Sequence, residues 1–448
     1  MSTKFKRITG IPTEIYLSIV SYLGPSDLFS LILTCKSLSS IAYQQLYSNL
    51  HFGISREAFA GRGITPPRPY GVADDFHLRI PPVMFSRLSG TLHEQKSRWE
   101  RDGCGIQFTK KFVLHTFGYD WGSGGQVELR IHQVCSTFGE AIEEGGMPAL
   151  REVFLECPDI CSINLRPLRL ALEKRQRSDF DSEFQISLGL KLTVQSLRRM
   201  TRTKHSLLSV IDPATLTLLD VQFSIRNMWG EDMLEDAERL GLDTELGNAK
   251  AEIQHLVNVL SEASRLKFLR LENYLKNPAS NPVYEIFEMY KLQDELAELQ
   301  QTILGLEKLE TLMLFGVVFH HSWFIVPPGN VRTLSVTGPL SGDWYREFAK
   351  HTLAGVVDLT IEYFDEDCGI WETSDGWELE LGEVAVTGLK AFRFRGYDGP
   401  EEWVNGLIEK NKGLEVVRGD VHKEKMKAAG WAVYTKGEDE YWLKKKTV

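Results

Sequence analysis

The sequence predicts an α/β protein in which three short N-terminal helices precede an irregular solenoid of strands with a parallel sheet. Two observations predict this fold. Residues 11–50 place apolar side chains at helical spacing in three runs, and Gly24-Pro25-Ser26 interrupts them. The rest of the chain repeats three apolar residues at positions i, i+3 and i+5, which fits a turn that runs into a short strand.

The N-terminal stretch has the start signal and the period of a helix. Pro12 suits a first helical position, because its missing N–H is not needed there, and Ile15, Ile19 and Leu23 then share one face. Helices of about ten residues are marginal alone in water. A domain of about forty residues rarely stays folded without disulfides, metal or a partner. The apolar faces therefore need a second surface: either the chain's own core, as in an ordinary helical subdomain, or another protein.

The order of residues in this stretch resembles the F-box, in the version common at the N-terminus of fungal F-box proteins. Ile11 stands where that family usually has Leu, and Leu38 where many members have Trp; both remain apolar. The matching positions are Pro12, Glu14, Ile15, Ile19, Leu23, Asp27, Leu28, Leu31, Cys35, Lys36, Ile41, Leu46 and Tyr47.

This resemblance implies a partner. F-box helices dock on a Skp-type adaptor, which bridges to a cullin–RING ubiquitin ligase, and the chain would have no catalytic residue of its own. The residues that the resemblance assigns to the adaptor contact are Ile11, Pro12, Ile15, Ile19, Leu23, Leu28, Leu31 and Cys35.

The recurring apolar pattern resembles an irregular leucine-rich-repeat array, with helical segments such as 253–260 and 292–303 between its strands. Trp431 to Tyr434 and Glu440 to Leu443 flank a polar turn and predict a terminal β-hairpin that caps the array. A generic α/β domain of βαβ units is the alternative. The copies start at Leu150, Leu216, Leu266, Leu309, Val331, Val356, Leu389 and, weakly, Leu414, with an early strand near Phe112.

These features divide the chain into four parts. We expect an F-box over residues 8–52, an irregular linker or excursion rich in Gly and Pro over 53–105, a leucine-rich-repeat-like domain that binds a target over 106–425, and a hairpin cap over 426–448.

The composition of the chain limits which partners it can bind and in which compartment we expect it. A net charge of −10 over 448 residues argues against a general nucleic-acid binder. No apolar run approaches the roughly 18 residues that span a bilayer, and no apolar segment follows the N-terminal basic residues as in a signal peptide. Six cysteines in a chain of this length indicate a reducing compartment, so we expect the cytoplasm, the nucleus or both.

The sequence lacks the motifs of an active site. It has no phosphate-binding loop, no dinucleotide fingerprint and no His-Glu-x2-His, so we expect no enzyme, cofactor or metal. Two charged segments are candidate target-binding sites, with solvated surface as the alternative. An acidic and aromatic segment contains Asp365, Glu366, Asp367, Trp371 and Trp377, and a basic segment contains Arg198, Arg199 and Arg202.

Three functions are open at this point. The first is the substrate-recognition subunit of an SCF-type ubiquitin ligase, and the second is an adaptor-binding scaffold or regulatory protein without a role in ubiquitination. The third is an enzyme with an α/β domain that follows the N-terminal helices, and only the size of the chain supports it.

Overall fold

The protein is described from a computed structural model, which divides into two compact units. The first is Met1–Lys191 with Lys204–Ile211, and the second is Leu192–Thr203 with Asp212–Val448. The structure describes residues 12–34, 38–52, 78–80, 105–115, 135–156, 166–178, 187–193, 213–223, 243–273, 293–315, 328–338, 355–363, 388–395, 408–419, 423–428, 430–436 and 439–444.

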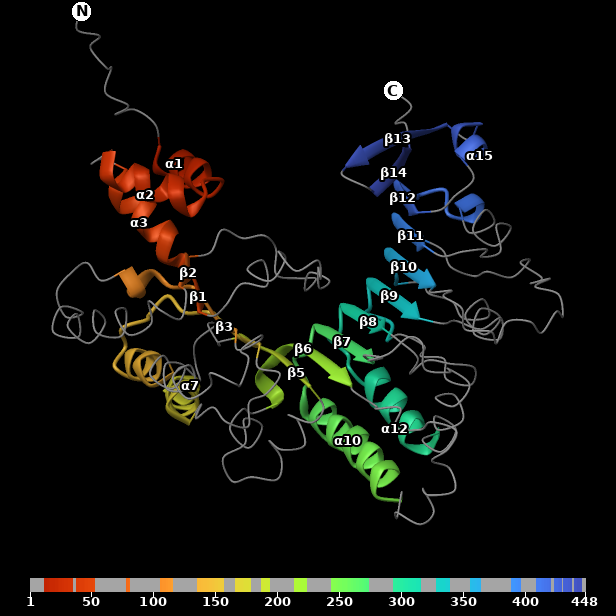
Figure 1. The fold of residues 1–448 in the computed structure, drawn as a ribbon, viewed down its shortest axis with the longest axis horizontal. Helices are drawn as coiled ribbons and strands as arrows, with labels where there is room; N and C mark the ends of the chain where they lie inside the picture. The colour runs from red at the N-terminus through yellow and green to blue at the C-terminus, as the bar shows by residue number, and fades with distance from the viewer. Residues whose placement is uncertain are drawn as a thin grey trace, which may run out of the picture. The chain divides into compact units, whose positions relative to one another are not determined.

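The first unit begins with three helices that lead into a parallel sheet (Figure 1). Its strands lie in the order β2-β1-β3-β4-β5, and each strand runs parallel to its neighbour. A further helix spans residues 135–143. The elements are α1 (Thr13–Val20), α2 (Pro25–Thr34), α3 (Ser39–Ser48), β1 (Asn49–Phe52), β2 (Leu78–Ile80), the 3-10 helix η1 (Gly105–Phe108), β3 (Lys111–His115), β4 (Glu152–Glu156), α7 (Arg166–Ser178) and β5 (Ser187–Thr193).

In the second unit the strands β6 to β12 follow one another in chain order, each parallel to the next (Figure 1). The hairpin of β13 and β14 ends the sheet, and β14 lies between β12 and β13 and runs antiparallel to both. The elements are η4 (Pro213–Thr215), β6 (Leu216–Phe223), α10 (Asp243–Glu262), β7 (Phe268–Asn273), α12 (Gln293–Leu304), β8 (Thr311–Phe315), β9 (Thr333–Gly338), β10 (Asp358–Tyr363), β11 (Ala391–Arg395), β12 (Val416–Gly419), α15 (Lys423–Ala428), β13 (Trp431–Lys436) and β14 (Asp439–Lys444).

One backbone contact recurs where successive strands of the second unit begin. The carbonyl oxygen of Lys267 accepts the N–H groups of Glu310 and Thr311, at 2.8 and 2.9 Å, and that of Glu310 accepts those of Arg332 and Thr333. The carbonyls of the corresponding residues before β9, β10 and β11 each accept two N–H groups of the following turn in the same way. Each turn therefore satisfies the backbone of its neighbour, which keeps the strands in one register.

The apolar residues of the repeated pattern form the core on one face of the sheet. Leu269, Leu312 and Leu334 are successive partners across β7, β8 and β9, and all three are buried. The apolar residue that opens each copy is also buried, and in every copy except that of Leu216, which begins β6, it lies in the turn before its strand. In the second unit these turn residues are Leu266, Leu309, Val331, Val356, Leu389 and Leu414.

The structure confirms the parallel α/β arrangement and most of the predicted elements. A strand lies at every predicted copy, α10 and α12 lie where helical spacing predicted them, and β13 and β14 form the predicted hairpin. Five elements were not predicted from the sequence: β1, β2, β5, α7 and the helix over 135–143. That the strands form a solenoid of leucine-rich-repeat type stays a prediction, as do the domain boundaries at 52, 105 and 425.

Candidate adaptor-binding surface of the N-terminal helices

The three N-terminal helices begin where the sequence interrupts its apolar runs. Pro12 precedes α1 with φ −56° and ψ 146°, and its carbonyl accepts the N–H of Ile15 at 3.1 Å. The carbonyl of Gly24 accepts the N–H of Leu28 at the start of α2, at 2.9 Å. A proline at the N-cap fits because only its carbonyl is used there.

The helices share a closed core of their own. Val20, Leu28, Ala42 and Leu46 are 1, 2, 0 and 8% exposed, so each of the three helices contributes to it. Partly buried apolar side chains surround this core; they are Leu23, Leu31, Ile32, Ile41 and Tyr47. Because the core closes without the remaining apolar side chains of α1 and α2, those side chains are available to another surface.

Large exposed apolar side chains concentrate on α1, α2 and the turn between them. Within the part of the chain that the structure describes, six of the nine such residues lie between positions 15 and 33. They are Ile15 (49% exposed), Leu17 (43%), Ile19 (51%), Tyr22 (78%), Phe29 (56%) and Leu33 (71%). Soluble proteins expose single apolar side chains everywhere, whereas a concentration on neighbouring helices is typical of a docking surface.

Two pairs of these residues are spaced to act together. Ile15 and Ile19 are four residues apart on α1, and Phe29 and Leu33 are four residues apart on α2. Residues at that spacing are neighbours on a helix surface. Each helix thus presents an apolar stripe beside the face that it buries in the core. Helices that are apolar on two faces are typical of elements that a partner covers.

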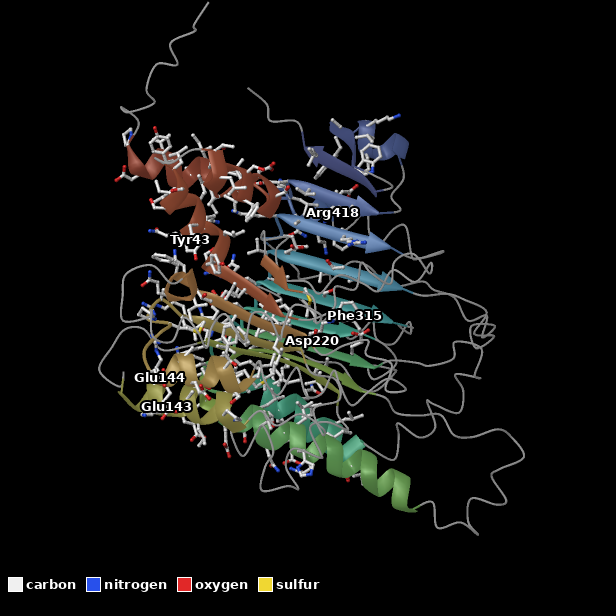
Figure 2. The ribbon with its side chains drawn as sticks, turned by 60° about the vertical axis from the view of Figure 1, so that its left-hand side comes forward. Tyr43, Glu143, Glu144, Asp220, Phe315 and Arg418 are labelled. Atoms are coloured by element: carbon white, nitrogen blue, oxygen red, sulfur yellow. The ribbon has the colours of Figure 1, made fainter. Side chains whose placement is uncertain are left out.

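The helical core is attached to the sheet without a linker. Ser48 ends α3 and Asn49 begins β1, which pairs with β3. The N–H of Lys110 donates to the carbonyl of Ser48 at 2.8 Å, and the hydroxyl of Thr109 donates to the carbonyl of Tyr47 at 3.1 Å. Tyr47 also contacts Tyr43, labelled on α3 in Figure 2, with ring centroids 4.6 Å apart. The end of α3 is therefore hydrogen-bonded to the segment that leads into β3.

The predicted adaptor-binding residues differ from one another in solvent exposure. Pro12, Ile15 and Ile19 are exposed, whereas Leu23 and Leu31 are half-buried. Leu28 is 2% exposed and lies in the core of the three helices, so it supports the surface from inside. The part of each of these residues in adaptor binding stays a prediction. Ile11 and Cys35 lie outside the described residues.

Both predicted target-binding segments fall outside the described residues. This holds for Asp365, Glu366, Asp367, Trp371 and Trp377, and for Arg198, Arg199 and Arg202. Their roles in binding a target stay predictions.

Four exposed residues were absent from the predicted adaptor surface: Leu17, Tyr22, Phe29 and Leu33. A signal for the last two was present in the sequence. The core face of α2 is accounted for by Leu28, Leu31 and Ile32, so a second apolar pair at i, i+4 spacing has no place in that core.

Two features, a metal-binding cluster and a membrane-spanning helix, are absent from the described residues. No set of three or more His, Cys, Asp or Glu side chains among them is arranged to hold a metal ion. No helix in the same part of the chain is long and apolar enough to cross a membrane.

The segment that contains the three helices is similar in sequence to a known domain family. Residues 8–53 match the family model described as F-box-like. A comparison of the chain with curated proteins finds no match. The chain thus carries an F-box-like domain, and its three helices are the elements of that domain. Such a domain indicates a role in binding a Skp-type adaptor, and proteins that carry it are generally non-catalytic.

Proposed function

We propose that this protein is the substrate-recognition subunit of an SCF-type ubiquitin ligase. Its F-box-like domain would bind the Skp-type adaptor, and its sheet domain, of leucine-rich-repeat type, would bind a target protein. The observation that carries the first half is the pair of exposed apolar stripes on α1 and α2, beside a core that closes without them.

The proposal requires no catalytic group in this chain. A ligase elsewhere in the complex would supply the chemistry, and this subunit would hold the target close to it. Holding two reactants together raises their effective concentration. The direct continuation of α3 into β1 supports this role, because it couples the adaptor-binding helices to the sheet of the first unit without a flexible segment. We place the protein in the cytoplasm, the nucleus or both, where such a ligase would act.

The test of the first half is calorimetric titration of the purified full-length chain with a purified Skp-type adaptor. The informative variant is Ile15→Ala with Ile19→Ala, because both side chains are about half exposed and neither belongs to the helical core. Truncating two apolar anchors at an interface weakens binding by roughly tenfold or more. Leu170→Ala is the matched control: Leu170 is 47% exposed and lies on α7.

Two results would refute adaptor binding through this surface. One is a folded wild-type chain that does not bind the adaptor. The other is a double variant that binds as tightly as the wild type. Leu28→Ala does not serve as the test variant, because loss of a buried leucine costs about 2–5 kcal/mol of stability and would weaken binding through unfolding.

The scaffold alternative makes the same prediction for the adaptor and differs on the target. Under the receptor proposal, proteins bound to the sheet domain are ubiquitinated by the reconstituted ligase, and their lifetime in cells lengthens when this chain is removed. Under the scaffold alternative the bound proteins keep their lifetime.

A further inference from the structure

The strands of the second unit carry a row of side chains on the sheet face opposite the leucine core. Neighbours in this row are direct partners across adjacent strands. From β6 to β12 the row reads Asp220, Arg270, Met313, Ser335, Thr360, Arg393 and Arg418.

One end of this row is closed to solvent. Asp220, Arg270, Met313 and Ser335 are between 2 and 8% exposed. The guanidinium group of Arg270 lies 3.5 Å from the Asp220 carboxylate and 2.8 Å from that of Glu272, and it stacks 4.6 Å above the Phe315 ring. Arg270 therefore has acidic partners within the fold, and its side chain is closed to solvent.

The other end of the row is open and basic. Arg393 on β11 is half-buried and Arg418 on β12 is exposed. The two arginines are direct cross-strand partners, so their Cα atoms are about 4.8 Å apart. Positive charge at both positions favours an anionic ligand over this part of the face. Figure 2 labels Asp220 on β6, Phe315 on β8 and Arg418 on β12.

An apolar strip runs beside the two arginines on the same face. Ala391 pairs with Val416, Val416 pairs with Leu443, and Leu443 pairs with Ala432. Leu443 is 41% exposed, and the other three are half-buried. The strip and the arginines together present apolar contact area next to positive charge. We name this surface, made of Arg393, Arg418, Ala391, Val416, Leu443 and Ala432, the arginine face.

We propose that the arginine face binds an acidic segment of the target protein, with Asp or Glu carboxylates at Arg393 and Arg418 and an adjacent apolar side chain on Val416 and Leu443. This names the class of target for the proposed receptor, so it rests on the proposed function. Guanidinium groups bind carboxylates through charge-assisted, often bidentate hydrogen bonds. Apolar contact beside them supplies area that charge alone does not.

Asp358 fixes where on this face the acidic residues would lie. It pairs with Ala391 across β10 and β11, so it lies on the same face as the arginines. Burial raises the pKa of its carboxyl group, while the charge of Arg418 lowers it. A ligand carboxylate near β10 would meet this acid, whereas one over β11 and β12 would meet the two arginines. The proposed acidic residues therefore lie over β11 and β12.

The test uses the full-length chain, without adaptor, on an array of peptides of random sequence. We expect the retained peptides to be enriched in Asp or Glu next to Leu, Ile or Phe. The best peptide is then measured by fluorescence anisotropy. Arg393→Ala with Arg418→Ala should weaken its binding by about tenfold or more, because two charge-assisted contacts are lost. Arg332→Ala is the matched control, since Arg332 is an exposed arginine in the turn before β9.

A second variant at the same surface should change the affinity for the acidic peptide in the opposite sense. Asp358→Asn removes the competing negative charge and should tighten binding of the acidic peptide. The inference is overturned by an array without acidic enrichment, by enrichment that the double arginine variant retains, or by binding of phosphoserine peptides but not of carboxylate peptides. Because the adaptor is absent from this assay, its outcome is separate from that of the adaptor titration.

Discussion

The ring of Tyr47 on α3 lies directly against the backbone of Gly105 in η1. A Cβ atom at Gly105 would come within 2.7–2.8 Å of Cγ, Cδ1 and Cδ2 of that ring. Glycine is therefore the residue that lets the last turn of the F-box-like domain reach the segment before β3. The contact lies next to the hydrogen bonds from Thr109 and Lys110 to the end of α3.

Gly105→Ala should loosen the attachment of the helices to the first unit. The new methyl group forces the Tyr47 ring to move, and overpacking of this kind typically costs about 1–3 kcal/mol. Urea unfolding measures the loss of stability, and faster amide exchange at Lys110 would locate it. Gly413→Ala is the control, because the nearest atom to a Cβ there is 3.8 Å away. Equal stability of the two variants would contradict the role assigned to this contact.

Much of the sheet was predictable because the strands β6 to β10 bury residues at the same three positions of each copy. An apolar residue in the turn and two in the strand give the i, i+3, i+5 pattern, as in Leu266, Leu269 and Leu271. Strand β5 was missed because Leu188 and Leu190 give only an alternation around Gly189. Strand β1 was missed because Leu46 and Leu50 fit the period of a helix as well as a strand that follows one.

The candidate surface was harder to predict than the sheet. Periodicity identifies an apolar face but does not tell whether that face packs on the same chain or on a partner. Leu28 and Phe29 are adjacent on α2 and both apolar, yet Leu28 is 2% exposed and Phe29 is 56% exposed. The difference depends on where α1 and α3 pack, which is a tertiary property. The cross-strand partnership of Arg393 and Arg418 likewise depends on register between segments distant in sequence.

The buried arginine of β7 should be sensitive to loss of its charge. Arg270→Met keeps the length of the side chain but removes the cation that lies within 3.5 Å of Asp220 and 2.8 Å of Glu272. Breaking a buried ion pair on one side costs about 3–5 kcal/mol, because a charge is left in a poorly solvated place. Chemical denaturation of this variant beside Arg332→Met, at an exposed arginine, measures the effect. A loss no larger than that of the control would show that the cluster contributes nothing to stability.

Gly355 and Gly329 make an asymmetric contact between two successive turns. A Cβ at Gly355 would lie 2.5 Å from the carbonyl oxygen of Gly329, whereas a Cβ at Gly329 would meet no atom within 4 Å. Gly355→Ala should therefore destabilise the second unit by about 1–3 kcal/mol, because a backbone atom must shift. Gly329→Ala should be neutral or stabilise by up to about 1 kcal/mol, since it restricts only the unfolded chain. Thermal unfolding of both variants is the measurement, and the reverse order would contradict the packing described.

The half-buried carboxyl group of Asp358 predicts a dependence of stability on pH. Burial raises its pKa from the ordinary value of 3.8, and the attraction of Arg418 only partly offsets this. With a raised pKa the folded state binds a proton more tightly than the unfolded state, so the contribution of Asp358 to stability falls as pH rises from 3.8 through the folded pKa. Asp358→Asn should then be more stable than the wild type at neutral pH, and this advantage should vanish below 3.8, where the carboxyl group is protonated in both states. Urea unfolding of the two proteins at several pH values tests the sign: a variant that loses stability at neutral pH would mean that the attraction of Arg418 outweighs the cost of burial.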